Sequence, residues 1–127
     1  MIDIDHFKRF NDTFGHQAGD KLLRAFGDLL NRRTRGQDIA CRYGGEEFAL
    51  ILSGATLDAA SKRAELFRED LTRLTVEHAS QVLESVTVSI GVAAAPGHGT
   101  TAEELLHAAD QGLYRAKAEG RDRIVAA

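Results

Sequence analysis

Apolar residues recur with helical spacing in several segments, and each such segment predicts a helix with one face against a core. Within residues 17–33 this stripe consists of Leu22, Leu23, Phe26, Leu29 and Leu30. Within residues 56–74 it consists of Ala60, Ala64, Phe67, Leu71 and Leu74. A last helix should begin with a capping box of Thr101 and Glu104, end near Ala118, and carry inward Leu105, Ala109, Gly112, Leu113 and Ala116. A shorter helix should follow an Asp5 cap, begin near Phe7 and end before Gly15.

Other apolar runs lack helical spacing and predict β-strands. Residues 39–43 and 48–52 are two such runs, separated by a pair of glycines and a pair of glutamates. Residues 86–94 alternate bulky Val and Ile with Thr, Ser, Gly and Ala, so this strand should have a small face that another element can approach closely. A final strand is expected at residues 123–125, after Gly120 ends the last helix. Interleaved strands and helices of this kind predict a mixed α/β layer fold.

Composition narrows the class of protein. A chain of 127 residues is long enough for one domain with a real core. Its 16 Lys and Arg against 19 Asp and Glu give a net charge of −3, which argues against a broad nucleic-acid or membrane surface. The single cysteine, Cys41, excludes an internal disulfide, and its apolar strand predicts a small core side chain. Because no apolar run reaches the length of a membrane span, we expect a cytoplasmic chain without membrane contact.

The residues between the first two apolar runs carry the candidate chemistry. Two glycines, Gly44 and Gly45, favour a tight hairpin with positive φ, and they leave the backbone bare enough for a ligand to approach. Two carboxylates, Glu46 and Glu47, follow directly. A purely structural hairpin would favour Asn-Gly or Asp-Gly and would seldom continue with Glu-Glu. The segment therefore indicates a ligand or metal site on a hairpin.

Residues 42–52, Arg-Tyr-Gly-Gly-Glu-Glu-Phe-Ala-Leu-Ile-Leu, resemble the GGDEF family of diguanylate cyclases in its Gly-Gly-Glu-Glu-Phe variant. Further motifs stand in the family's order, and together they cover essentially the whole chain: residues 3–8, 11–12, 15–16, 19–20, 35–38, 89–93, 109–110, 113–114, 116–117 and 120–121. The resemblance implies a palm-like nucleotidyl cyclase fold, with a central mixed sheet of about five strands flanked by helices.

The same resemblance implies a metal and catalytic set. Asp3, the carbonyl of Ile4 and Glu46 would hold two Mg²⁺ (or Mn²⁺) ions per active site, and Glu46 and Lys8 would be catalytic. Magnesium usually takes only one or two protein carboxylates, so Asp3 and Glu46 suffice if their strands are neighbours. Taken alone, Asp3 could be a helix-capping acid and Glu46 a solvated turn residue. Glu47 is a secondary candidate.

Substrate residues follow from the resemblance in the same way. Asn11 and Asp20 would read guanine, since an amide and a carboxylate suit the donor-rich edge of that base. Gly44 and Gly45 would let the guanine and ribose lie against the hairpin. The triphosphate would be held by Lys117 and Arg121 together with Lys8, although each would otherwise be an ordinary solvated cation. His16 could serve the turn or contact the ligand.

Arg35 and Asp38 match the Arg-x-x-Asp motif of the family's inhibitory product site. Arginine can bond two acceptors of guanine at once, and aspartate can accept from the opposite edge of the base. Arg68 resembles a supporting arginine of this site. A second arginine that family members contribute from further upstream has no counterpart.

The implied activity is the condensation of two GTP molecules, one on each of two opposed domains, into cyclic di-GMP and two pyrophosphates. The alternative is a weakly active or inactive receptor module that binds GTP or cyclic di-GMP; a purely structural dimerisation module would leave the clustered acids unexplained. The resemblance further implies that residues 1–127 lack the family's first helix and most of its first strand, and that a sensory domain lies upstream. With so few residues before it, Asp3 is expected to be held loosely.

Overall fold

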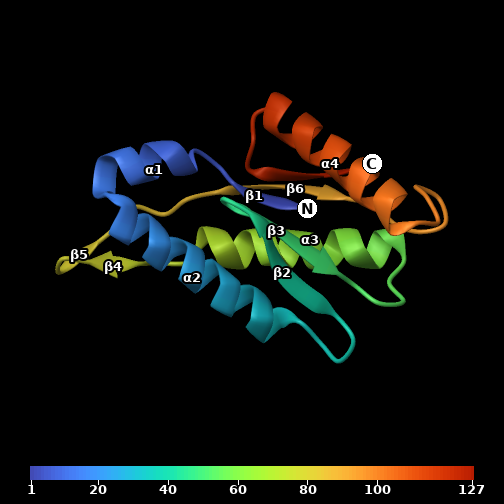
Figure 1. Cartoon of the computed structure of the whole chain (residues 1–127), viewed down its shortest axis with the longest axis horizontal. Helices are drawn as coiled ribbons and strands as arrows, with labels where there is room; N and C mark the ends of the chain where they lie inside the picture. Colours follow the sequence, from blue (N-terminus) through green and yellow to red (C-terminus); the bar gives the residue numbers. More distant parts are fainter.

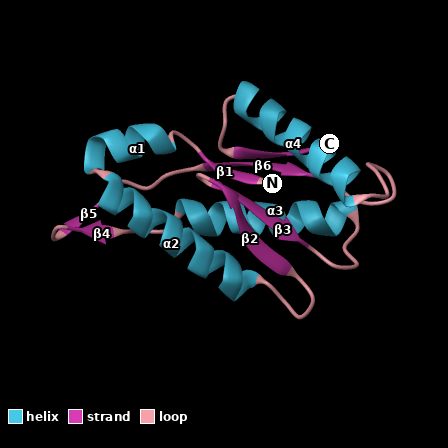
Figure 2. Cartoon of the chain, in the orientation of Figure 1, coloured by secondary structure: helices cyan, strands magenta, loops and turns pink.

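The computed structural model describes residues 1–127, and its elements interleave along the chain (Figures 1 and 2). The helices are α1 (Phe7–Phe14), α2 (His16–Arg33), α3 (Leu57–Thr72) and α4 (Ala102–Ala118). The strands are β1 (Ile2–Ile4), β2 (Ile39–Gly44), β3 (Glu47–Ile51), β4 (Glu77–His78), β5 (Gln81–Val82), β6 (Val88–Val92) and β7 (Arg123–Ala126). The predicted helices and long strands are all present, with small shifts at their ends.

Five strands form the central sheet in the order β2-β3-β1-β6-β7. All neighbours are antiparallel except β6 and β7, so the predicted mixed sheet is confirmed. The short strand β1 lies in the middle, with Asp3 opposite Glu47 on one side and Ser89 on the other. Asp3 is therefore fixed by ladders on both sides and only 5% exposed, and the expectation that it is held loosely is wrong.

The two faces of the sheet are covered differently. On one face, α3 packs against β6 and α2 packs against β2, and the two helices bury the main core, which includes Phe26, Phe67 and Ile90. On the other face, α4 lies directly on the small side of β6. A methyl group added at Gly91 would be 1.9 Å from the carbonyl oxygen of Ala109, so strand and helix backbones touch here. The predicted close approach to the small face of this strand is confirmed.

Several local expectations need correction. Asp5 does not cap α1: His6 is the N-cap residue, in a left-handed conformation, and Asp5 is buried in bonds to other elements. Cys41 is exposed rather than part of the core, because β2 is an edge strand that is poorly covered. Of the glycine pair, only Gly45 has a positive φ (46°), since Gly44 still belongs to β2.

A second, two-stranded sheet of β4 and β5 lies apart from the central one, at the left end of the molecule in Figure 1. The pattern of apolar residues did not predict it. Its turn places Ala79 and Ser80 at positive φ without a glycine or asparagine, so the usual signal of a tight turn is missing from the sequence. No helix of the chain combines the length and the apolar character that crossing a bilayer requires.

Candidate functional site

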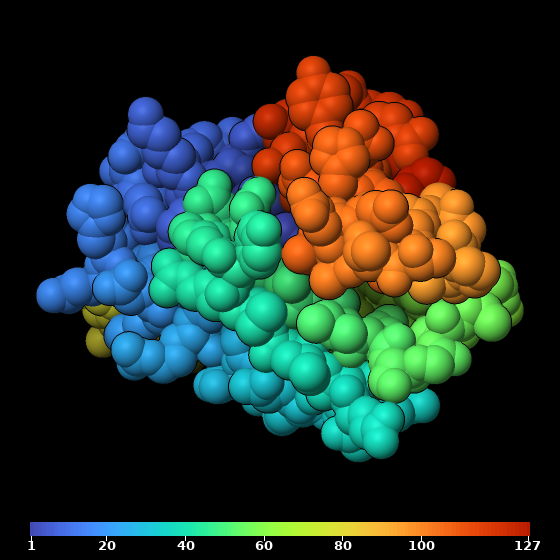
Figure 3. Space-filling view, turned by 45° about the vertical axis from the view of Figure 1, so that its right-hand side comes forward, coloured from blue at the N-terminus to red at the C-terminus, as the bar shows by residue number.

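The glutamates of the β2–β3 hairpin lie beside the end of the central strand. Glu47 pairs with Asp3 across the β1–β3 ladder, and the carbonyl oxygen of Glu46 accepts a hydrogen bond of 3.3 Å from the Ile4 amide. These contacts bring three carboxylates of the predicted metal region together. In the space-filling view of Figure 3, the hairpin lies between the N-terminal segment and the C-terminal helix.

The electrostatics of this cluster favour a bound cation. The pKa of Asp3 is raised to about 6, mainly by burial and to a smaller extent by the negative charges of Glu46 and Glu47. Lys117 acts in the opposite direction: its Nζ lies 2.9 Å from Asp3 Oδ2 and holds the carboxylate in its charged form. The acid cluster is thus stabilised by positive charge.

This donor set fits a divalent cation of the magnesium type. Carboxylate and carbonyl oxygens are the ligands that such ions prefer, and a magnesium site needs few of them from the protein. No group of three or more acidic, histidine or cysteine side chains has ready-made metal geometry. The residues therefore suit a site completed by phosphates and water, with Asp3 and Glu46 as the protein's carboxylates. Participation of the Ile4 carbonyl stays a prediction.

Asn11 in α1 has an unpartnered acceptor. Its Oδ1 is buried without a hydrogen-bond donor, a state that structures rarely tolerate without a reason. The side chain lies against Gly19 of α2, where a methyl group would be 1.7 Å from this oxygen. Asp20, the other predicted guanine reader, follows Gly19 directly and is exposed. The α1–α2 corner thus brings together the two residues predicted to read guanine.

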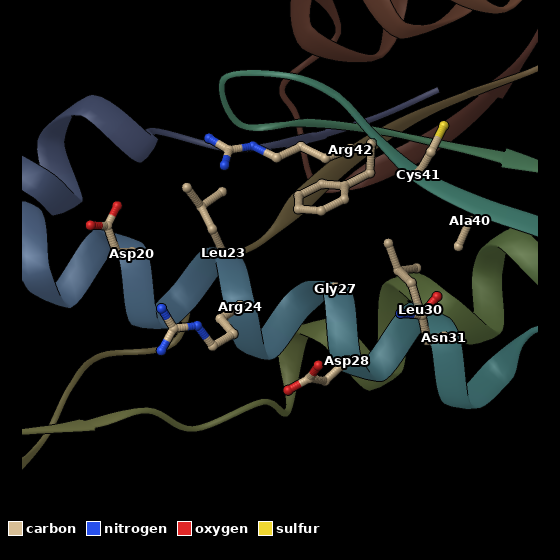
Figure 4. Close-up of a pocket in the computed structure, with 11 residues that line it drawn as sticks. Asp20, Leu23, Arg24, Gly27, Asp28, Leu30, Asn31, Ala40, Cys41 and Arg42 are labelled. Atoms are coloured by element: carbon tan, nitrogen blue, oxygen red, sulfur yellow. The ribbon is translucent and has the colours of Figure 1, made fainter.

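A cavity of about 400 Å³ extends from this corner between α2 and the β2–β3 hairpin (Figure 4). Asp20 lies at one end and Arg42 reaches over Leu23, while Leu30 and Ala40 line the far part. The lining is therefore mixed: apolar residues alternate with the polar side chains of Arg24, Asp28 and Asn31 along α2. Sequence reasoning did not single out Arg42, whose Nε donates a hydrogen bond of 2.8 Å to the carbonyl of Gly45 and so shapes the hairpin tip.

The three cations predicted to bind phosphate differ in exposure and in ion pairing. Lys117 contacts Asp3, as described above. Lys8 is exposed in the first turn of α1, and Arg121 is half-buried in the turn after α4. Neither side chain is in an ion pair, so both are free to contact a ligand. His16 is the exposed first residue of α2.

The Arg-x-x-Asp segment lies before β2, away from the acid cluster. Asp38 accepts from the amides of Arg35 (3.1 Å) and Ser53 (3.2 Å) and from Nη1 of Arg63 (2.7 Å). These bonds, above all that from Arg63, hold the pKa of Asp38 below its usual range. Arg68 is bonded elsewhere, to Glu65 and Asp122. The arginine that the structure brings to Asp38 is therefore Arg63, which the sequence did not reveal.

Comparison with known proteins identifies the family. A family model described as "Diguanylate cyclase, GGDEF domain" matches residues 1–123. The chain belongs to the GGDEF family. It is 48% identical to the response regulator PleD of Caulobacter vibrioides over 98% of its length, and 42% identical to the diguanylate cyclase DgcP of Pseudomonas aeruginosa, also over 98%. It spans only 28% and 18% of these relatives.

Solved GGDEF structures share the fold. The GGDEF domain of DgcB from Caulobacter crescentus, in complex with c-di-GMP, superposes with a TM-score of 0.90 at 36% identity, covering 98% of this chain and 74% of that one. The diguanylate cyclase SiaD from Pseudomonas aeruginosa, in complex with its activator SiaC, gives 0.91 at 37% identity, covering 99% and 48%. The predicted family and fold are confirmed. The roles of individual GGDEF site residues stay predictions.

Proposed function

We propose that this GGDEF domain condenses two GTP molecules into cyclic di-GMP and two pyrophosphates. The observation that carries the proposal is the buried Asp3 carboxylate, set between the hairpin glutamates and 2.9 Å from Lys117. A buried carboxylate paired with a partly exposed ammonium group, beside a hairpin without bulky side chains, suits a triphosphate with its counter-ions. The unpartnered acceptor of Asn11 suits a base that offers donors, as guanine does.

The site residues would bind three different parts of the substrate complex: the base, the phosphates and the metal ions. Asn11 and Asp20 bind the base, Gly44 and Gly45 leave room for base and ribose, and Lys8, Lys117 and Arg121 hold the phosphates. Asp3, the Ile4 carbonyl and Glu46 hold the metal. When bound, two Mg²⁺ or Mn²⁺ ions would lower the pKa of the attacking hydroxyl and neutralise the triphosphate.

Each 3′-hydroxyl attacks the α-phosphorus of the GTP on the facing domain, and the bond to the β-phosphate breaks to release pyrophosphate. A second GGDEF domain is thus the required partner. Incubation of the protein with GTP and Mg²⁺, with products followed by chromatography, tests the activity. The rate should rise with the square of protein concentration when the protein is dilute. No cyclic product at any concentration would refute the cyclase.

A receptor role is the second candidate, because a relative at 36% identity is described in complex with c-di-GMP. We propose that Arg35, which is exposed and has no side-chain partner, binds a product guanine together with Asp38. Arg68 donates hydrogen bonds to Glu65 and Asp122, and it would have to break them to contact the product. Binding of cyclic di-GMP without any turnover of GTP would favour this second function.

A further inference from the structure

Asp5 is a buried carboxylate that the proposed mechanism does not use. It is 4% exposed and accepts three hydrogen bonds from two parts of the chain, the β6 segment and the turn after α4. Its Oδ1 accepts from Ser89 Oγ at 2.7 Å, and its Oδ2 accepts from Thr87 Oγ1 at 2.6 Å and from the Asp122 amide at 3.1 Å. Both carboxylate oxygens accept hydrogen bonds from the protein, so Asp5 connects segments of the chain and does not serve as a ligand-binding group.

The segment tied by Oδ2 has an unusual backbone. Gly120, Arg121 and Asp122 have successive φ values of 119°, 64° and 47°. Two consecutive non-glycine residues in the left-handed region are unfavourable and persist only where surrounding contacts hold them. The contacts here are the Asp5 carboxylate, an ion pair of 2.6 Å between Arg68 and the Asp122 carboxylate, and a bond of 2.9 Å from the Arg121 amide to the Ala116 carbonyl.

Two connections join this turn to the proposed site. Arg121 lies in the turn, and Lys117, which contacts Asp3, is at the end of the helix that enters it. Asp5 itself is two residues beyond Asp3, directly after the central strand. One carboxylate therefore links the strand end that carries the acid cluster to the turn that carries a phosphate-binding cation.

We propose that Asp5 is a positioning residue for the triphosphate: it holds the Arg121–Asp122 turn in its left-handed form and so fixes the place from which Arg121 can reach the phosphates. The inference rests on the proposed function, because it assumes that Arg121 contacts the β- and γ-phosphates. The proposal assigns phosphate binding and base binding to two different parts of the site. The turn serves the phosphates, whereas Asn11 and Asp20, on α1 and α2, serve the base.

The near-isosteric variant Asp5→Asn tests the proposal, since it weakens the acceptor for the Asp122 amide without opening a cavity. The probes are GMP and the α,β-methylene analogue of GTP, which cannot be turned over, each titrated calorimetrically with Mg²⁺. The analogue should bind about tenfold more weakly to the variant, the usual worth of a charge-assisted contact, whereas GMP should change by less than about twofold. Equal losses for the two nucleotides would reduce Asp5 to a structural role and overturn the proposal.

Ser89→Ala is the matched control, because it removes a bond to Oδ1 of the same carboxylate and leaves the Asp122 bond in place. It should leave the affinity for the analogue within about twofold. A loss as large as that of Asp5→Asn would mean that any damage to the network weakens binding, and would contradict the specific role of the turn.

Amide hydrogen exchange provides a readout that needs no variant to fold. In the unsubstituted chain the Asp122 amide should be protected, and the triphosphate analogue should protect it further while GMP does not. Identical exchange with both nucleotides would overturn the proposal. If the unsubstituted chain binds neither GMP nor the analogue, the proposed function itself is refuted, which is a different result from equal losses in the variant.

Discussion

Lys117, near the end of α4, places its ammonium nitrogen 2.9 Å from a carboxylate oxygen of Asp3 in the central strand. The pair joins residues 114 positions apart, and the Asp3 side chain is only 7% exposed. A buried carboxylate beside two further acids depends on such a partner.

Replacing Lys117 by methionine should therefore destabilise the fold by about 1–3 kcal/mol at neutral pH, because the buried acid loses its counter-charge. Urea unfolding measures the loss. Lys62→Met is the control: its ion pair with Asp58 is largely exposed on both sides and should be worth less than about 1 kcal/mol. Similar losses in the two variants would show that Asp3 does not need Lys117.

Glu46→Gln should abolish turnover and leave the fold intact. The side chain is half-buried at the hairpin tip and is not part of the hydrophobic core, and its charge is what the proposed metal site requires. We expect a loss of at least about a hundredfold in cyclic di-GMP formation, followed by chromatography. Glu84→Gln, at an exposed position without a partner, should retain the wild-type rate. Near-normal product formation by the Glu46 variant would remove Glu46 from the metal site.

Arg35→Ala should weaken cyclic di-GMP binding by about 1–3 kcal/mol, the usual worth of a bidentate contact to guanine. It should also relieve inhibition by product in an active preparation. Calorimetry provides the affinity, and Arg32→Ala, an exposed arginine at the end of α2, is the matched control. Unchanged affinity in the Arg35 variant would mean that the product binds elsewhere, for example where Asn11 and Asp20 read the base.

Asp38 should stabilise the fold in a pH-dependent way. Its pKa is lowered in the folded state, mainly by Arg63, so its contribution is complete above the ordinary aspartate value of about 4 and disappears as the pH falls through the lower folded value. Asp38→Asn should therefore cost stability at pH 7 and progressively less in strong acid. Unfolding curves across this range provide the measurement. A loss that is the same at both ends would mean that the charge of Asp38 contributes nothing.

Gly91→Ala should destabilise the domain by about 1–3 kcal/mol or more, as overpacking does, because the new methyl group meets the backbone of α4. The contact is backbone against backbone, so no side chain can move aside. Gly97→Ala is the control, since nothing lies within 4 Å of its added carbon and its φ is not positive. Thermal unfolding of the two variants should separate them. If both unfold at the wild-type temperature, α4 can move away from β6 at little cost.

Much of this architecture follows from sequence periodicity. The helical stripes around Phe26 and Phe67 and the alternation around Ile90 are local patterns, and local patterns predict elements well. The position of Cys41 was not predictable in the same way. Its strand is apolar in sequence, but only the order of strands in the sheet decides that it lies at an edge.

The sequence predicts the type of site, but not the tertiary contacts that hold its residues in place. Glycines followed by carboxylates indicate a ligand-binding hairpin, and the family resemblance supplies candidates such as Asn11 and Lys117. That Asp5 would join β6 to a turn more than a hundred residues away, or that Arg63 would contact Asp38, depends on tertiary packing that no local pattern encodes. The sequence predicts a helix cap at Asp5, because an aspartate just before a helix is usually a cap.

The central position of β1 in the sheet has a consequence for how the domain folds during synthesis. One of the two neighbours of β1, the strand β6, lies more than eighty residues further along the chain, and the cation that pairs with Asp3 comes later still. Contacts of such long range are slow to form, because much of the intervening chain must be ordered before they can close. The acid cluster therefore cannot assemble on the ribosome until nearly all of the domain has emerged, and a partly synthesised chain leaves Asp3 without either β6 or Lys117.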